Sequence, residues 1–370
     1  MNGPLRIAQI MGYMNGGGVE SVVMNYYRHI DRSRVQFDLV VCEGSTMVPR
    51  EELESLGGRV FMVPSYPHVV EYQKALSGLF RKERWNIVHS HMNALSVFPL
   101  RAAKKTGVPV RIAHSHSSNG GGKGELAKDA MKMVLRQFSR VYPTNLLACS
   151  KAAGDWLFGV DSGYAVLPNA VDVAAFAPNE TLRIEARRRL GISDETFVVG
   201  HIGRMVPSKN HLFLLTVFKA LLDMAPDSLL LLAGEGPLLD EIRRKVSELD
   251  IADKVCFLGQ RDDPAVLYRA FDVFCLPSIY EGLPMVGVEC QASSTPILSS
   301  NTVTEEAAMT SLMEFESLAS TPEEWAQRLL SMRGRVPASG DLERLAAFNV
   351  SATAKKLEDY YFECLKGVSY

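Results

Sequence analysis

The sequence contains none of the patterns that mark disulfide-bonded, zinc-binding or membrane-spanning proteins. Its six cysteines are scattered, and no two of them form a C-x-x-C pair. Cysteines in apolar runs behave as small hydrophobic residues, which favours a reducing compartment and argues against zinc. The longest apolar stretches, of which Leu229–Ala233 is typical, are too short to span a bilayer. Because Met1–Arg6 leads straight into a predicted strand, we expect no signal peptide and a cytoplasmic protein.

The signatures of dehydrogenases, P-loop proteins and nucleic-acid-binding proteins are absent as well. The first glycine-rich turn is not G-x-G-x-x-G, which disfavours a Rossmann dehydrogenase, and it lacks the Lys-Ser/Thr pair of a P-loop. The basic residues are not interleaved with aromatic residues, which disfavours nucleic acid as a partner.

The charge is nearly balanced overall, at −2, but it is unevenly distributed. Residues 1–175 carry a net charge of +6, and residues 176–370 carry −8. A basic first half favours an anionic partner for that half, such as a membrane surface or a phosphorylated acceptor. Chance asymmetry is the alternative interpretation.

Strand and helix patterns alternate twice along the chain, which predicts two doubly wound parallel sheets. A length of 370 residues suits two such domains. The proline-bounded segment Pro168–Asn179 is predicted to be an irregular linker. We therefore place the first domain at residues 1–170 and the second at residues 171–343. Ligands bind such sheets at the carboxyl ends of the strands.

Three features of the first domain could contact a ligand. Gly16-Gly17-Gly18 lies between a predicted strand and helix, as in phosphate-approaching turns, although a plain tight turn is an equal alternative. His89 and His91, and likewise His114 and His116, lie at predicted strand ends. They could bind a phosphate or sugar, chelate a metal or serve the fold. No acidic residue or cysteine lies nearby in sequence, so we expect no metal.

A basic amphipathic helix is predicted over 125–142, with cationic residues spaced by four. Its polar face could be solvated, or it could contact anionic lipid headgroups. The cationic residues are Lys128, Lys132, Arg136 and Arg140.

The second domain holds the stronger candidates. Arg204 and Lys209 follow a predicted strand and precede a helix, so two cations and a helix N-terminus could clamp a diphosphate. Solvated loop charges are the alternative. Farther on, Glu281 lies in the loop of a strand–loop–helix unit, and Glu289 lies within the helix that begins near Pro284. Two carboxylates around a helix N-terminus suit a ligand with a negative centre and hydroxyl groups on either side.

Taken in order, these motifs resemble the nucleotide-sugar-dependent glycosyltransferases of family 4, which have the GT-B fold of two Rossmann-like domains facing across a cleft. The resemblance extends over nearly the whole chain and is greatest to the branch that builds bacterial capsular and extracellular polysaccharide. The segments that carry it are Gly16–Glu20, His114, Pro168–Asp172, Gly203–Asn210, Gly234–Pro237 and Glu281–Glu289.

The resemblance implies a donor site and a catalytic set. It assigns the diphosphate to Arg204 and Lys209, the donor sugar to Glu281 and the ribose hydroxyls to Glu289. His114 would contact the sugar near the reacting centre, so the implied catalytic residues are His114, Arg204, Lys209 and Glu281. The full implied donor-binding set is Gly16, Gly17, Gly18, Gly203, Arg204, Lys209, Gly234, Leu258, Glu281, Gly282, Leu283 and Glu289.

The resemblance further implies retention of anomeric configuration and no cofactor or metal, which agrees with the absence of an Asp-x-Asp motif. It also implies that a final helix, at about 344–370, crosses back to the first domain. We expect a UDP- or GDP-sugar donor and a glycan or polyprenyl-linked acceptor, with peripheral attachment at the inner membrane face. A non-catalytic scaffold subunit and a sugar-nucleotide epimerase are the alternatives. One departure from the family pattern is Gln291–Pro296, where a glycine before the proline is usual.

Overall fold

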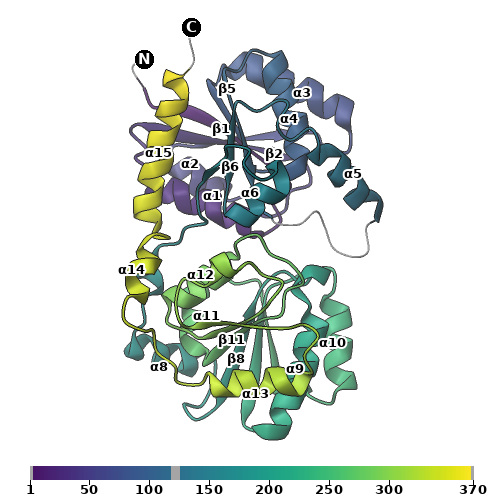
Figure 1. Ribbon diagram of the computed structural model, residues 1–370, viewed down its shortest axis with the longest axis vertical. Coiled ribbons are helices and arrows are strands. Elements are labelled where there is room, and N and C mark those ends of the chain that lie inside the picture. The colour runs from purple at the N-terminus through teal and green to yellow at the C-terminus, as the bar shows by residue number, and fades with distance from the viewer. Residues whose placement is uncertain (1–2, 118–125, 368–370) are drawn as a thin grey trace. The chain divides into compact units, whose positions relative to one another are not determined.

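The computed structural model describes residues 3–117 and 126–367 of the chain. The chain divides into two compact units, of which unit 1 comprises Met1–Ala170 with Val350–Tyr370 and unit 2 comprises Val171–Asn349. Each unit is built on one sheet with helices on both of its faces (Figure 1). The predicted fold class, two doubly wound parallel-sheet domains, is confirmed.

Unit 1 has a seven-stranded sheet in the order β3-β2-β1-β4-β5-β6-β7, and every pairing is parallel. Its strands are β1 (Leu5–Gly12), β2 (Val35–Cys42), β3 (Arg59–Val63), β4 (Ile87–Ser90), β5 (Val110–Ser115), β6 (Asn145–Ala148) and β7 (Ala165–Val166). Its helices are α1 (Gly18–His29), α2 (Arg50–Ser55), α3 (Val69–Glu83), η1 (Asn93–Ser96), α4 (Val97–Lys105), α5 (Leu126–Arg136), α6 (Lys151–Phe158) and α15 (Val350–Lys366).

Unit 2 has a six-stranded parallel sheet in the order β10-β9-β8-β11-β12-β13. Its strands are β8 (Phe197–Ile202), β9 (Ser228–Ala233), β10 (Val255–Gly259), β11 (Val273–Leu276), β12 (Ile297–Ser300) and β13 (Met313–Glu316). Its helices are α7 (Val173–Phe176), α8 (Glu180–Arg189), η2 (Pro207–Lys209), α9 (His211–Met224), α10 (Leu239–Glu248), η3 (Ala252–Lys254), α11 (Pro264–Ala270), α12 (Met285–Ala292), η4 (Glu305–Ala307), α13 (Pro322–Ser331) and α14 (Asp341–Ala346).

Each sheet has its own core because its strands are covered on both faces. The central strands are nearly continuous apolar runs, as expected for parallel strands. In β11, all four residues are buried. One core contains Val199, Leu214, Phe218, Leu230 and Trp325 in unit 2. The other contains Ala8, Val40, Leu76, Val88 and Ala113 in unit 1.

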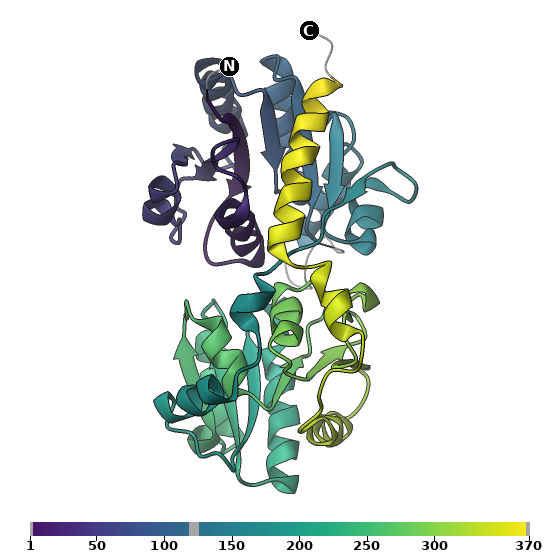
Figure 2. The same ribbon diagram turned by 90° about the vertical axis from the view of Figure 1, so that its left-hand side faces the viewer.

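The C-terminal helix α15 belongs to unit 1, where it packs against α1 (Figure 2). The single final helix expected at about 344–370 is wrong in its continuity. Two helices, α14 and α15, are separated at residues 347–349. There, the backbone N–H of Val171 donates to the carbonyl of Phe348, at 3.0 Å, and Val171 forms a parallel bridge with Asn349.

The basic helix is shorter than the predicted range of 125–142. Among the described residues, α5 ends at Arg136, and turns continue to Val141 before Pro143. Glu125 lies outside the described residues. The linker 168–179 is also less irregular than predicted, because Asp172 caps the short helix α7 by accepting the N–H of Ala174 at 3.1 Å. Within the described ranges, no helix combines the length and apolarity needed to cross a bilayer.

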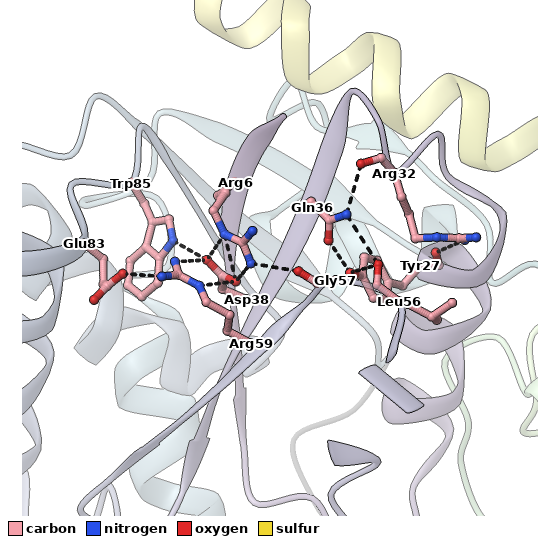
Figure 3. Close-up of polar contacts among 10 residues, drawn as sticks. All are labelled: Arg6, Tyr27, Arg32, Gln36, Asp38, Leu56, Gly57, Arg59, Glu83 and Trp85. Atoms are coloured by element: carbon pink, nitrogen blue, oxygen red, sulfur yellow. Dashed lines mark hydrogen bonds and ion pairs between the residues drawn. The ribbon is translucent and has the colours of Figure 1, made fainter. Parts of the chain in front are cut away.

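A buried carboxylate links the strands β1, β2 and β3 of the unit 1 sheet (Figure 3). Asp38 of β2 is fully buried and accepts from Arg6 of β1 at 2.9 Å, from Arg59 of β3 at 2.6 Å and from the Trp85 indole at 2.8 Å. Arg59 also pairs with Glu83 at 2.8 Å. Burial by itself raises the pKa of Asp38, but the three donors outweigh it and hold the pKa below its usual value. This Asp38 network therefore joins three strands through a fully paired charge.

Candidate active site

The strand orders place the predicted site residues at the two topological switch points. In unit 1 the chain changes direction across the sheet between β1 and β4, and in unit 2 it does so between β8 and β11. Doubly wound sheets bind ligands at the carboxyl ends of such strands. Gly16–Gly18 follow β1, and the histidines end β4 and β5. Arg204 and Lys209 follow β8, and Glu281 follows β11.

Lys209 and Glu281 form an ion pair in unit 2. The Lys209 ammonium lies 2.6 Å from Glu281 Oε1, and the Ser278 hydroxyl donates to the same oxygen at 2.8 Å. Both charged side chains are largely buried, with 17% and 16% of their surfaces exposed. The turn after β8 and the turn after β11 are also joined by a backbone hydrogen bond, because the Ile279 N–H donates to the Ser208 carbonyl at 2.8 Å. A diphosphate bound here would share the ammonium with a carboxylate.

The turns after β8, β9 and β10 are in direct contact. The N–H of Gly203 donates to Ala233 at 2.9 Å, and the N–H of Gly234 donates to Gly259 at 2.7 Å. Gly234 has φ +129°, and a Cβ there would lie 2.1 Å from the Gly203 carbonyl oxygen, so only glycine fits. Arg204 is exposed in the first of these turns, and no side-chain partner of it occurs among the described residues. Leu258 precedes Gly259 and is partly buried.

Glu289 occupies the second turn of α12, which begins after Pro284, as the sequence predicts. The Tyr268 hydroxyl donates to Glu289 Oε2 at 2.9 Å. Removal from water raises the pKa of Glu289 to about 7, although the hydrogen bond from Tyr268 opposes the rise. Gly282 and Leu283, at the N-terminal side of this helix, are buried.

The departure from the family pattern at Gln291–Pro296 has a structural counterpart. Gln291 is fully buried, and its amide oxygen accepts the N–H groups of Met309 and Thr310 at 3.0 and 2.9 Å. Its amide nitrogen donates to the carbonyls of Gly287 and Ala307, at 2.8 Å each. Gln291 therefore fixes the loop after β12 to α12. Ser294, which follows α12, has a positive φ of 57°, a conformation that glycine adopts at less cost.

The glycine loop of unit 1 already holds an internal carboxylate. Glu20 accepts the backbone N–H groups of Asn15, Gly16 and Gly17 at 2.8, 2.7 and 2.7 Å. Glu20 is also the third residue of α1, so its carboxylate caps the start of this helix by accepting the N–H of the N-cap residue Gly17. These amide groups are engaged within the loop, so a phosphate here would have to displace or share them.

The four histidines at the ends of β4 and β5 form one buried cluster. His89 Nε2 lies 3.1 Å from His114 Nδ1, and His91 Nδ1 lies 2.9 Å from His116 Nε2. Burial, with mutual repulsion, lowers the pKa of His89, His91 and His114 well below the usual value, and burial lowers the pKa of His116 to about 3. All four imidazoles are therefore neutral at pH 7.

Two further residues complete this cluster, and sequence reasoning missed both. The Tyr361 hydroxyl of α15 lies 2.8 Å from His89 Nδ1, and Gln9 Oε1 of β1 lies 2.8 Å from His91 Nε2. Gln9 could have been found from the sequence, because it is a polar residue in an apolar strand. Three of the histidines are close enough to hold a metal ion. However, both ring nitrogens of His89 and His91 are already hydrogen-bonded, so the contacts support hydrogen bonding rather than chelation.

Two doubly wound units with charged residues at a topological switch point form an arrangement suited to ligand binding. Two family models identify the class of enzyme. The model of the glycosyl transferase 4-like domain matches residues 17–170, and the model of the glycosyl transferases group 1 matches residues 183–310. The chain belongs to the family 4 glycosyltransferases of the GT-B fold. The resemblance drawn from the sequence motifs is confirmed.

Similar proteins include two bacterial glycosyltransferases. The chain is 35% identical over 348 residues to the putative glycosyltransferase EpsF of Bacillus subtilis, covering 92% of this chain and 89% of that protein. It is 26% identical over 318 residues to a UDP-Gal:α-D-GlcNAc-diphosphoundecaprenol α-1,3-galactosyltransferase of Escherichia coli, covering 80% and 79%.

Solved structures show the same fold. Sucrose-phosphate synthase of Thermosynechococcus elongatus superposes with a TM-score of 0.82 at 19% identity, covering 98% of this chain and all of that one. HepE of Anabaena, in complex with UDP and glucose, superposes with a TM-score of 0.78 at 15% identity, covering 97% and 100%.

Proposed function

We propose that this glycosyltransferase moves a sugar, with retention of configuration, from a UDP- or GDP-sugar to a glycan or polyprenyl-linked acceptor. Capsule or exopolysaccharide synthesis is the process it would serve. The observation that carries the proposal is the Lys209–Glu281 pair at the β8/β11 switch point. Glu289 lies in the second turn of the helix that follows Glu281. The similarity to the Escherichia coli galactosyltransferase, whose name gives a diphosphoundecaprenol-linked acceptor, supports the polyprenyl-linked acceptor class.

The chemistry needs charge stabilisation on the leaving group. As the bond between the sugar C1 and the diphosphate breaks, negative charge develops on the phosphate oxygens. Lys209, Arg204 and the first N–H groups of α12 would stabilise it without a metal. The acceptor hydroxyl would form its bond to C1 on the same face and pass its proton to a phosphate oxygen. Glu281 would bind sugar hydroxyls, which agrees with its being an ion-paired carboxylate rather than a free nucleophile.

The remaining roles follow the family pattern. Glu289 would bind the ribose hydroxyls, the backbone at Leu258 and Gly259 would contact the base, and His114 would contact the transferred sugar. Unit 2 would thus hold the donor, and the basic unit 1 would present the acceptor.

The test is a panel of labelled UDP- and GDP-sugars, incubated with bacterial membrane extract and assayed for label in lipid and polysaccharide fractions. We expect one donor to be incorporated and its anomeric proton to show the donor's configuration by NMR. Release of an epimerised nucleotide sugar without acceptor would indicate an epimerase. If no donor is converted, the transferase proposal fails, and the protein would be a non-catalytic scaffold subunit.

We also propose that the segment 130–141 attaches the protein to anionic membrane at its cytoplasmic face. Five large apolar side chains are exposed there among the cations Lys132, Arg136 and Arg140. They are Met131, Met133, Val134, Phe138 and Val141.

Vesicle flotation tests this attachment. Wild-type protein should float with vesicles that contain anionic lipid and remain behind with neutral ones. Val134→Asp should weaken flotation, whereas Val336→Asp, at an even more exposed valine of unit 2, should not. Equal flotation of both variants would contradict the assignment.

A further inference from the structure

A continuous chain of hydrogen bonds runs from β1 through α15 to His114. The Gln9 amide nitrogen lies 3.1 Å from the Tyr361 hydroxyl, which lies 2.8 Å from His89 Nδ1. His89 Nε2 then lies 3.1 Å from His114 Nδ1. All four side chains are almost fully buried, so water cannot replace these partners. The chain joins residues up to 352 positions apart in sequence.

The Gln9 amide gives this chain a direction. Its NH₂ group can only donate, so the Tyr361 oxygen accepts from it and the Tyr361 O–H is left to donate to His89 Nδ1. A neutral imidazole has one N–H, so His89 must carry its proton on Nε2 and donate to His114 Nδ1. By the same rule, His114 carries its own proton on Nε2.

The other face of Gln9 supports the same orientation. Its amide oxygen can only accept, and it lies 2.8 Å from His91 Nε2, which therefore carries the proton. His91 Nδ1 then accepts from His116 Nε2, at 2.9 Å. Burial lowers the pKa of every histidine in the cluster, so each ring is neutral and carries one N–H. The hydrogen bonds on both sides of Gln9 therefore each have one donor hydrogen.

The chain ends at a donor without an acceptor. His114 Nε2 is buried and has no hydrogen-bond partner among the described residues. A buried N–H without a partner is costly, which makes it a natural contact for a ligand oxygen. A metal would need the lone pair that this tautomer lacks at Nε2.

We propose that Tyr361 and Gln9 are positioning residues, which act through His89 to hold His114 as the Nε2–H tautomer, ready to donate to an oxygen of the transferred sugar. The sugar contact rests on the proposed function, whereas the tautomer does not. The proposal also gives α15 a role at the site, because this helix carries Tyr361 to the ends of β4 and β5.

The direct test is NMR of the full-length protein labelled with ¹⁵N in the histidine rings. Long-range ¹H–¹⁵N correlations at neutral pH distinguish the two tautomers, and a His114→Gln variant identifies the His114 signals. We expect His114 Nε2 to be protonated and Nδ1 to be unprotonated. A protonated Nδ1, or a ring that exchanges between both forms, would overturn the proposal.

Tyr361→Phe tests the positioning role itself. Removing the hydroxyl should move the His114 nitrogen signals towards the average of the two tautomers and lower kcat/KM about tenfold. Tyr360→Phe removes a hydroxyl from the adjacent residue of α15, whose partners are Cys364 and Asn145, and should change neither. Unchanged His114 signals in Tyr361→Phe would refute the positioning role. If the tautomer is as expected but no sugar is transferred by the wild type, the proposed function fails while the positioning of His114 stands.

Discussion

Unit 1 contains two buried polar networks that differ in how they end. The Asp38 network is charged and closed, because both carboxylate oxygens are bound by Arg6, Arg59 and Trp85. The histidine cluster is neutral and open, because it ends at His114 Nε2, which lacks a partner among the described residues. Asp38 and the four histidines are all buried, so the difference is not one of burial.

The difference separates stability from ligand binding. A buried charge is tolerated only when every lone pair is satisfied, so the Asp38 network has no capacity for a ligand. A neutral network that leaves one donor unsatisfied is less stable than it could be, which is typical of sites where a ligand completes the contacts. We therefore expect the two networks to respond differently to pH and to substitution.

Acid should produce the largest effect. The histidines of the cluster have folded-state pKa values below the unfolded value of about 6.5, so the unfolded chain binds more protons as the pH falls. Their contribution to stability is complete above pH ~6.5 and is lost below it, by up to about 1.4 kcal/mol per pH unit for each histidine. Thermal unfolding should show a falling midpoint between pH 7 and pH 5.

The Asp38 network should lose stability in another pH window. The pKa of Asp38 is lowered, so its contribution to stability persists until the pH falls below the unfolded value of about 3.9.

Two histidine variants control the prediction for pH 7 to pH 5. His68→Asn at an exposed position should leave the pH dependence unchanged, whereas His116→Asn should flatten it. A midpoint that is constant from pH 7 to pH 5 would contradict neutral buried histidines.

Removing the closed network's carboxylate should cost the most stability at neutral pH. Asp38→Ala leaves two guanidinium groups and the Trp85 N–H without their shared acceptor, which we expect to cost about 3–5 kcal/mol. Denaturant titration measures the loss, and Asp31→Ala at an exposed aspartate serves as the control. Activity per folded molecule should be unchanged. A specific loss of activity in folded Asp38→Ala would break the distinction between the two networks.

Lys209→Ala tests whether the Lys209–Glu281 pair of unit 2 is functional. If Lys209 stabilises the leaving diphosphate, kcat/KM per folded molecule should fall by about 10²–10³-fold, in addition to the stability that is lost when the largely buried Glu281 carboxylate is left without its partner. Lys219→Ala, which breaks an exposed pair on α9, is the matched control and should retain activity. Full activity in Lys209→Ala would show that the pair serves the fold alone.

Glu289 should give the smallest effect. Its pKa is raised to about 7, so at neutral pH about half of the molecules hold a protonated carboxyl. If the carboxylate binds ribose hydroxyls, affinity for the nucleotide should rise roughly tenfold between pH 6 and pH 8. Calorimetric titration with UDP and GDP at both pH values measures this. Glu289→Gln should remove the pH dependence, and a dependence that survives in Glu289→Gln would have another origin.

The sequence predicts the fold and the location of site residues better than their contacts. Alternating apolar strands and helices predict two parallel sheets, and the ends of their strands locate Lys209 and Glu281. Their pairing is not predictable, because it depends on how crossovers bring residues 72 positions apart into contact. The same holds for Tyr361, which reaches His89 through the tertiary position of α15. Glu20 differs, because an acidic residue in the first turn of a helix that follows a glycine-rich loop is a local signal in the sequence.

Hydrogen–deuterium exchange with the donor panel tests the central claim most directly, that unit 2 binds the nucleotide sugar at the β8/β11 switch point. Protection should appear in the backbone of residues 203–210 and 282–289 when a UDP- or GDP-sugar is added, and Lys209→Ala should reduce it. The strands around Asp38, which belong to unit 1, should exchange as before. The absence of protection in both segments with every nucleotide sugar would contradict the account.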